Sequence, residues 1–294
     1  MIISIKDCWK DAEADHHKYF DTIVLKKRKA LEKSLPPPVV RFLETHHDKI
    51  REGDESDFRS IQAKYLRLMS SFTKARQNDI EQSIKKIFNY SAFSAKNTNG
   101  VWCAYSLCAK LGSTTCPYCN LAYGHTLVIK GNGRIRPELD HFFDKANYPL
   151  FAISLNNFVP SCHFCNSSLK HSGNFFTNFH LNPLLDDEAI EVVMDVNPIK
   201  ARNNEKLFDT ANIQLKYDKA NPKAANSVAT FHLEERYQFL VGEAREIAKY
   251  VTVYRGRQGL IKGDIEWAKR GVDASNYKNR ILGKLILDIA AFYL

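Results

Sequence analysis

The stretch from Cys116 to Lys170 decides what this chain can fold into. It contains Cys116-Pro-Tyr-Cys119 and, separated from it by residues 120–161, Cys162-His-Phe-Cys165. Two C-x-x-C pairs supply four thiolates, which suit one tetrahedral zinc ion. A redox or disulfide role for such pairs, or chance, is the alternative. The spacing predicts that Cys116, Cys119, Cys162 and Cys165 bind a structural zinc ion that staples a segment with few long apolar runs.

Polar residues lie between and after the two cysteine pairs. Glu138-Leu-Asp140-His141 comes between them, and Asn157, Asn166 and Lys170 flank the second pair. Asp-His followed by two asparagines supplies a base, an orienting group and oxygen ligands for a hard cation. Taken singly, such residues are most often surface, turn or capping residues. In register with the cysteine pairs, they predict a catalytic metal site beside the structural one.

Composition and charge set the class of protein. The chain has 294 residues, is 44% hydrophobic and 26% charged, and carries a formal net charge of +9, so a polyanionic partner is plausible. Its seven cysteines are an odd number, which argues against the disulfide framework of a secreted domain. We found no run of about 18 apolar residues that would cross a membrane. We therefore expect a cytoplasmic protein with no membrane partner.

Apolar periodicity predicts helices on both sides of the cysteine-rich segment. We expect helices over about residues 14–33, over 39–50 after Pro36-Pro37-Pro38, over 57–88, over 233–251 and over 276–294. The histidine pairs His16-His17 and His46-His47 fall in charged helical stretches, and we expect them to be solvated. The predicted organisation is a helical region over 1–112, a cysteine-rich domain over 113–200 and a helical region over 201–294.

Between these regions the sequence predicts short strands. Residues 127–136 are typical of a hairpin around Gly131-Asn132-Gly133, with Asp140 and His141 at the end of the returning strand or just beyond it. A short strand should follow Asn157, and a helix beginning near Cys162 should carry Asn166 and Lys170. Lys130, Arg134 and Arg136 on the hairpin suit DNA backbone contacts, or simply form a solvated face. The fold class is α+β and mostly helical.

The block from Leu139-Asp-His-Phe-Phe to Asn157-Phe-Val-Pro-Ser-Cys-His-Phe-Cys-Asn166-Ser-Ser-Leu-Lys170 resembles the HNH endonucleases. That superfamily uses a ββα-metal finger, and many members add two C-x-x-C motifs around it. The resemblance covers about residues 114–183. It implies a central, zinc-stapled ββα-metal finger, within an HNH nuclease domain over 113–200, flanked by the two helical regions.

A narrower resemblance extends beyond the finger. Leu139-Asp-His-Phe-Phe-Asp-Lys-Ala-Asn-Tyr-Pro-Leu, Leu181-Asn-Pro, Phe231-His-Leu-Glu-Glu-Arg-Tyr and Leu282-Gly-Lys-Leu are similar to PtuB. PtuB is the nuclease subunit of Septu-type and retron-associated antiphage systems. This resemblance implies an ATPase partner similar to PtuA, with the nuclease as the effector of a defence complex, in some cases within a retron complex.

The HNH resemblance implies a role for each matching residue. His141 is the general base that activates water, and Asn157 holds the loop that carries His141. Asp140 and Asn166 bind the catalytic ion, where Asn166 stands in place of the histidine of other members. Lys170 contacts a flanking phosphate. Two oxygen ligands leave room for water and the scissile phosphate, which favours Mg²⁺ or Mn²⁺.

The expected activity is metal-dependent hydrolysis of phosphodiester bonds in DNA. One alternative is a zinc-dependent nucleic-acid-binding module without chemistry, and another is an adaptor that the zinc finger shapes for protein contacts. A third is an HNH nuclease that acts on RNA. The set of Asp140, His141, Asn157 and Asn166 favours a nuclease, because neither a binding module nor an adaptor requires those residue types in that register.

Overall fold

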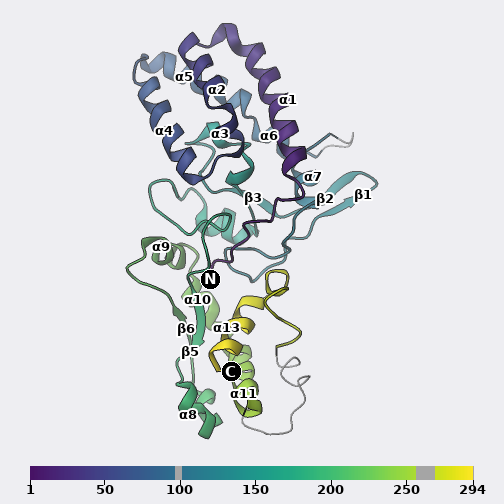
Figure 1. The fold of residues 1–294 in the computed structure, drawn as a ribbon, viewed down its shortest axis with the longest axis vertical. Helices are drawn as coiled ribbons and strands as arrows, with labels where there is room; N and C mark the ends of the chain where they lie inside the picture. Colours follow the sequence, from purple (N-terminus) through teal and green to yellow (C-terminus); the bar gives the residue numbers. More distant parts are fainter. Residues whose placement is uncertain (97–100, 256–268, 294) are drawn as a thin grey trace.

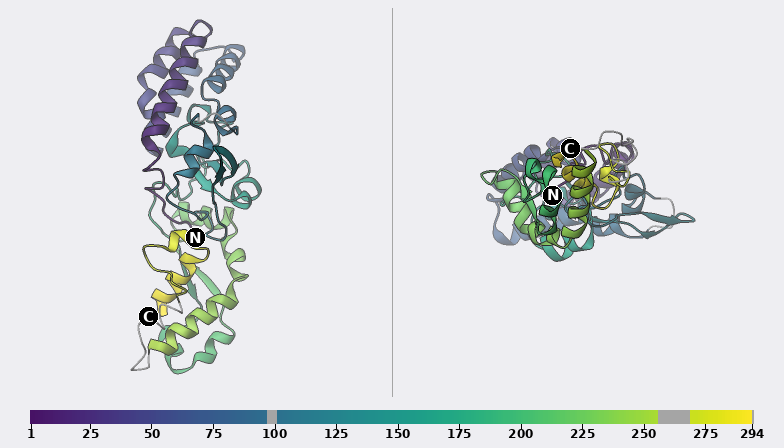
Figure 2. Two further views of the ribbon diagram at one scale, coloured as in Figure 1. Left: turned by 90° about the vertical axis from the view of Figure 1, so that its right-hand side faces the viewer. Right: turned by 90° about the horizontal axis from the view of Figure 1, so that it is seen from below.

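The computed structural model of the chain describes residues 1–96, 101–255 and 269–293. The molecule is elongated in both side views (Figures 1 and 2). A group of helices from the N-terminal part occupies one end, the cysteine-rich segment lies in the middle, and the C-terminal elements occupy the other end (Figure 1). The α+β, mostly helical class expected from the sequence is confirmed.

The helices at the N-terminal end pack with neighbours that are distant in the chain. They are α1 (Glu13–Leu31), η1 (Glu32–Ser34), α2 (Pro37–Thr45), α3 (His47–Glu52), α4 (Glu55–Met69) and α5 (Lys74–Ile87). α1 contacts α3 and α5, and α2 contacts α4. α2 begins at Pro37, because proline has a helical φ and lacks only an N–H group that a first turn leaves unpaired.

The single helix expected over residues 57–88 is wrong, because the chain breaks between α4 and α5. The hydroxyls of Ser70 and Ser71 donate to the carbonyls of Arg67 and Leu68, at 2.8 and 2.7 Å. Such local bonds compete with the helical ladder. Thr73 then caps the new helix by accepting a hydrogen bond from the amide of Arg76.

The middle of the molecule consists of short elements. They are α6 (Tyr90–Ser94), α7 (Ala104–Ala109), β1 (Leu127–Ile129), β2 (Asn132–Ile135), β3 (Glu138–His141), η2 (Pro149–Phe151), η3 (Leu155–Asn157), β4 (Phe158–Ser161) and η4 (Phe164–Lys170). The hairpin is confirmed: β1 pairs with β2 through a Lys130-Gly131 turn in which both residues have positive φ. Asp140 and His141 lie just beyond it on β3, which pairs antiparallel with β4.

The first twelve residues belong to this middle region rather than to the N-terminal helices. The amides of Ile3 and Ile5 donate to the carbonyls of Pro117 and Pro183, at 2.8 and 2.7 Å. The indole of Trp9 donates to the carbonyl of Phe158 in β4. The start of the chain is therefore hydrogen-bonded to the cysteine-rich segment before α1 begins.

The C-terminal end combines a two-stranded sheet with helices. Its elements are β5 (Glu191–Met194), α8 (Pro198–Asn203), η5 (Glu205–Asp209), β6 (Ile213–Lys216), α9 (Pro222–Thr230), α10 (Leu233–Gln238), α11 (Val241–Arg255), η6 (Tyr277–Asn279) and α13 (Gly283–Tyr293). β5 pairs with β6, and α13 packs on β5 and α11. β5 precedes the expected boundary at residue 200 but lies with the C-terminal elements, because it pairs with β6 and packs on α13; the boundary itself falls inside α8. Among the helices that the structure describes, none combines the length and apolar content of a membrane span.

The expectation that His16 is solvated is wrong, because its side chain is fully buried between α1 and the middle region. One ring nitrogen, Nε2, lies 2.9 Å from the carbonyl of Ile153, and Trp102 donates to the other, Nδ1, at 3.2 Å. A carbonyl can only accept and an indole N–H can only donate, so the ring is neutral with its proton on Nε2. Burial lowers the pKa of His16 to about 4.

The His16 environment predicts a loss of stability in mild acid. The pKa of His16 is 6.5 when unperturbed and about 4 in the fold, so the unfolded chain binds a proton first. The part of the unfolding free energy that depends on neutral His16 is on the order of 3 kcal/mol. It is fully present above pH 6.5 and is lost as the pH falls towards 4. We expect His16→Gln to show a shallower decline of unfolding free energy than the natural chain in urea titrations from pH 7 to 4.

The exposed His125 provides the control, since His125→Gln should keep the slope of the natural chain. Identical slopes for the natural chain and His16→Gln would show that His16 does not carry this acid sensitivity.

Candidate metal centre and polar pocket

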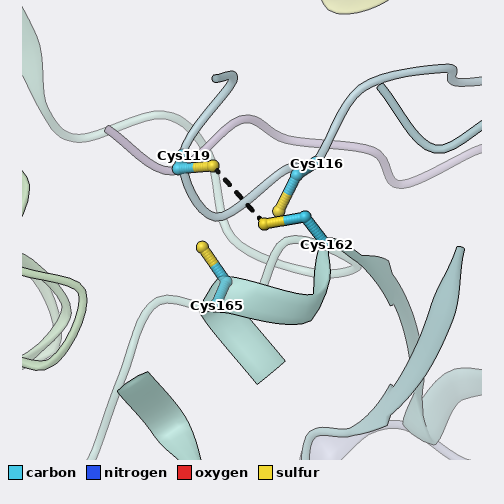
Figure 3. Close-up of side chains that lie close together, drawn as sticks. All are labelled: Cys116, Cys119, Cys162 and Cys165. Carbon is cyan, nitrogen blue, oxygen red and sulfur yellow. Dashed lines mark hydrogen bonds between the residues drawn. The ribbon is translucent and has the colours of Figure 1, made fainter. Parts of the chain in front are cut away.

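Four cysteine sulfurs converge in the middle of the molecule (Figure 3). The Sγ atoms of Cys116, Cys119, Cys162 and Cys165 all lie within 4.8 Å of one another, and those of Cys119 and Cys162 are 3.9 Å apart. A tetrahedral zinc ion with Zn–S bonds of about 2.3 Å places its sulfurs about 3.8 Å apart. The four cysteines that the sequence paired therefore stand close enough together to hold one zinc ion, and no disulfide joins them.

The first cysteine pair lies on a tight turn. The amides of Cys119 and Asn120 both point to the carbonyl of Cys116, at 3.3 and 2.7 Å. Asn120 closes the turn with a φ of 52°, a left-handed conformation that asparagine tolerates better than most residues. The amide of Leu121 then donates to the sulfur of Cys119 at 3.4 Å. The second pair lies at the start of η4, directly after β4.

One cation lies against the sulfur cluster. Nη1 of Arg236, from α10, is 3.4 Å from the sulfur of Cys165. Burial raises the pKa of the Cys116 thiol, so without a metal this sulfur holds its proton. A zinc ion binds thiolates, and four thiolates around Zn²⁺ leave a net negative charge that Arg236 would partly balance.

β3, β4 and η4 form a second centre next to the sulfur cluster. In the β3–β4 pair, Asp140 lies opposite Val159 and His141 lies opposite Phe158. A pocket of about 280 Å³ opens at this place. It is lined by Tyr90, Arg136, Glu138, Leu139, Asp140, His141, Asp144, Lys145, Asn166, Ser167, Lys170 and His171. Of the expected second-centre residues, Asp140, His141, Asn166 and Lys170 thus line one pocket.

The ring of His141 is held in one orientation. Its Nε2 lies 3.0 Å from the carbonyl of Ala152, and Tyr90 and Phe158 meet it edge to face. Burial is the main cause that lowers the pKa of His141 to about 3, with the charge of Lys145 next. The ring is therefore neutral, carries its proton on Nε2, and has a lone pair on Nδ1. Among the described residues, nothing hydrogen-bonds to that Nδ1.

Asn157 lies behind His141 rather than in the pocket. It is fully buried, and its Oδ1 accepts a hydrogen bond from the amide of Phe143 at 2.8 Å. Its Nδ2 donates to the carbonyls of Phe143 and Phe151, both at 3.0 Å. Both donors and the acceptor are used, so Asn157 fastens the loop that follows His141 to the segment that precedes Ala152.

Asp140 is buried and already has a counter-ion. Nζ of Lys170 lies 2.8 Å from each of its carboxylate oxygens, and the hydroxyl of Tyr118 donates to Oδ2 at 2.6 Å. The ammonium also donates to the carbonyl of His141 at 2.6 Å. The side chain of Lys170 is only 2% exposed. Lys170 is thus an internal partner of Asp140, and in this arrangement it does not present its charge to a phosphate outside.

Asn166 faces Glu138 on the other side of the pocket. Its Nδ2 donates to Oε2 of Glu138 at 2.8 Å, next to the hydroxyl of Ser167, while His163 binds Oε1. Partial burial raises the pKa of Glu138, but the hydrogen bonds of His163, Ser167 and Asn166 outweigh it and hold that pKa below its ordinary value. Glu138 is therefore an anion. Within the part of the chain that the structure describes, no group binds the amide oxygen of Asn166, so this oxygen is free to bind another ligand.

η4 is a π-helix, a rare form that often occurs at functional sites. The amide of His171 donates to the carbonyl of Asn166, five residues earlier, at 2.9 Å. The wider turn lets one short element send Cys165 to the sulfur cluster and Lys170 to Asp140. Spacing alone predicted a helix here but not its π form.

Sequence reasoning missed several residues of this centre, among them Tyr118 and Asp144. Tyr118 lies inside the first C-x-x-C motif, and its ring stacks on Phe231 while its hydroxyl binds Asp140. Asp144, three residues after His141, lines the pocket. The position of Tyr118 between two metal ligands was a signal for its importance, whereas nothing in the sequence pairs it with Asp140.

Comparison with known proteins adds no relative. No protein-family model matches the chain, and neither the curated proteins nor the solved structures contain a match.

The sulfur cluster predicts one zinc ion per chain. Cys165→Ser removes one ligand, so we expect it to lose the zinc and more than about 3 kcal/mol of unfolding free energy. Metal analysis and urea denaturation measure the two quantities. Cys103→Ser, at a buried cysteine outside the cluster, should retain the zinc. If the natural chain is purified without chelators and still contains no zinc, the prediction is wrong.

The Lys170–Asp140 pair predicts a second stability effect. Lys170→Met leaves a buried carboxylate without its counter-ion, so we expect a loss of about 3 kcal/mol at neutral pH. The double variant Lys170→Met/Asp140→Asn removes both charges and should recover much of that loss. Thermal and urea denaturation provide the measurement, and additive losses in the double variant would show that the two groups do not act as a pair.

Proposed function

We propose that this chain is a metal-dependent endonuclease of the HNH type that hydrolyses phosphodiester bonds, with His141 as the general base. The observation that carries the proposal is the neutral ring of His141, fixed by Ala152 and lining a polar pocket with Asp140 and Asn166. The antiparallel β3–β4 pair followed by η4 supports it, because the resemblance implies a ββα order at that place.

The residues suit attack by water on phosphorus. Nδ1 of His141 takes a proton from water while a water O–P bond forms and the P–O3′ bond breaks, and the leaving oxygen takes a proton from solvent. A general base works best when its pKa lies near the working pH, and the pKa of buried His141 is about 3. A phosphate in the pocket is an anion and raises that pKa by stabilising the imidazolium form.

Asp140 and the Oδ1 atom of Asn166 are the proposed ligands of Mg²⁺ or Mn²⁺, and such an ion supplies charge stabilisation at the phosphate and the leaving oxygen. A carboxylate has about four acceptor positions. Lys170 uses two of those on Asp140 and Tyr118 uses one. One position remains, so the carboxylate can take a cation only beside the Lys170 ammonium or in its place.

We further propose DNA as the substrate and a role as the effector nuclease of an antiphage complex with an ATPase similar to PtuA. The net charge of +9 supports a polyanionic substrate. The sequence resemblance to PtuB supports the ATPase and the retron or Septu context. RNA has the same phosphodiester chemistry and forms the second substrate to be assayed.

A second candidate is a zinc-stabilised nucleic-acid-binding module without catalysis. The observation that favours it is the Lys170 ammonium, which already neutralises the carboxylate that a catalytic ion needs. The two candidates differ in Mn²⁺ binding. A nuclease should bind Mn²⁺ through Asp140, and Asp140→Asn should abolish that binding. The nucleic-acid affinity of a binding module should change neither on addition of Mn²⁺ nor with Asp140→Asn.

The nuclease proposal predicts metal-dependent nicking of supercoiled plasmid. With Mg²⁺ or Mn²⁺ we expect the zinc-loaded chain to nick DNA and His141→Ala to be slower by at least about 100-fold, because general base catalysis supplies that much. His46→Ala alters the histidine that follows α2, which does not line the pocket, and should nick as the natural chain does. Zinc content must be equal in the three preparations.

Equal nicking by the natural chain and His141→Ala would show that His141 is not the base. If the natural chain, with and without the ATPase partner, cleaves neither DNA nor RNA, the binding module replaces the nuclease.

A further inference from the structure

The hairpin β1–β2 projects from the middle of the molecule as a separate arm (Figure 1). It also stands away from the body when the molecule is viewed from below (Figure 2). In this hairpin Ile129 lies opposite Asn132 and Leu127 lies opposite Ile135. The register shifts between Leu127 and Val128. None of the roles proposed above for the pocket uses this arm.

The arm exposes aliphatic side chains on both of its strands. Leu127, Val128 and Ile129 are 44%, 42% and 45% exposed, and Ile135 is 60% exposed. Four branched side chains on one small hairpin are more than scattered surface residues, and apolar strands left open to water are an association hazard. A partner that covers them is the physical explanation.

The same arm is strongly basic. Lys130 at the turn and Arg134 on β2 are exposed, and Arg136 follows β2. Residues 125–137 contain no acidic residue, and within the described parts of the chain neither Lys130 nor Arg134 has an ion-pair partner. A second copy of this chain would bring like charges together, so the charge favours an anionic partner.

The arm is held against α7, and its base leads to the polar pocket. Gly133 packs against the ring of Tyr105 from α7, where an added Cβ would come within 2.2 Å of that ring. The guanidinium of Arg136 lies over the same ring, 5.3 Å from its centre, and Arg136 lines the pocket that contains His141. The arm is therefore held in a set direction from the proposed site of hydrolysis.

We propose that the β1–β2 hairpin is a duplex-DNA-binding arm that lies in a groove next to the scissile phosphate. A two-stranded ribbon fits a groove of B-DNA, and aliphatic side chains can contact sugars and base edges there. Lys130 and Arg134 contact the phosphates on the rims. This inference rests on the proposed function, because the arm is useful to the pocket only if the substrate is DNA.

The test measures DNA affinity without cleavage. The zinc-loaded full chain carrying His141→Ala is titrated, without divalent ions, into a fluorescein-labelled duplex at several salt concentrations. Adding Lys130→Ala/Arg134→Ala should weaken binding about tenfold and lower the slope of log affinity against log salt by about 2, since each phosphate contact contributes about 0.9. Lys26→Ala/Lys29→Ala, which removes two exposed cations of α1, should leave the slope unchanged.

The aliphatic contacts have their own variant. Val128→Thr/Ile135→Thr keeps strand-forming residues of similar size, so the hairpin is retained. It should weaken binding several-fold without changing the salt slope, because no phosphate contact is lost. If only Lys130→Ala/Arg134→Ala weakens binding, and the salt slope does not change, the proposed phosphate contacts are overturned.

The outcomes separate this inference from the proposed nuclease. Plasmid nicking together with duplex binding that none of the arm variants alters overturns the arm but not the nuclease. Arm-dependent duplex binding without any metal-dependent cleavage supports the arm and overturns the nuclease. If the duplex does not bind, the aliphatic arm faces a protein instead, and the inference fails.

Discussion

The convergence of four cysteine sulfurs is the constraint on which the rest of this structure depends. The cluster joins the turn after α7 to the start of η4, and Arg236 reaches it from α10. The side chain of Asn120, the residue after Cys119, accepts a hydrogen bond of 2.9 Å from the amide of Lys284, which lies at the start of α13. Segments from both halves of the chain therefore meet within a few residues of the sulfurs, where a bound zinc ion would stabilise all of them at once.

The sulfur cluster and the polar pocket form one physical unit. Tyr118 is held between Cys116 and Cys119 and donates to Asp140, while Lys170, on the same short helix as Cys165, neutralises that carboxylate. Any displacement of either cysteine pair would move a hydrogen-bond partner of Asp140. A structural metal can thus set the orientation of a carboxylate that it does not touch.

The balance of charge in the pocket decides what it can bind. A buried ion pair is costly to open, because removing one partner leaves the other unpaired in a poorly solvated place. A divalent ion at Asp140 must offset the cost of separating that carboxylate from Lys170. Glu138 remains an anion nearby, with three polar side chains bound to it. The pocket therefore combines the neutral imidazole of His141 with a carboxylate that an ammonium already holds.

The sequence by itself determined the features that local chemistry specifies: the two cysteine pairs, the hairpin around Gly131, the strand after Asn157 and the helix after Cys162. Those signals depend on spacing and turn residues. Only the tertiary structure decided the rest. It buried His16, placed β5 with the C-terminal elements and turned Lys170 inward to Asp140. Burial and ion pairing depend on residues far apart in the chain, which no local pattern encodes.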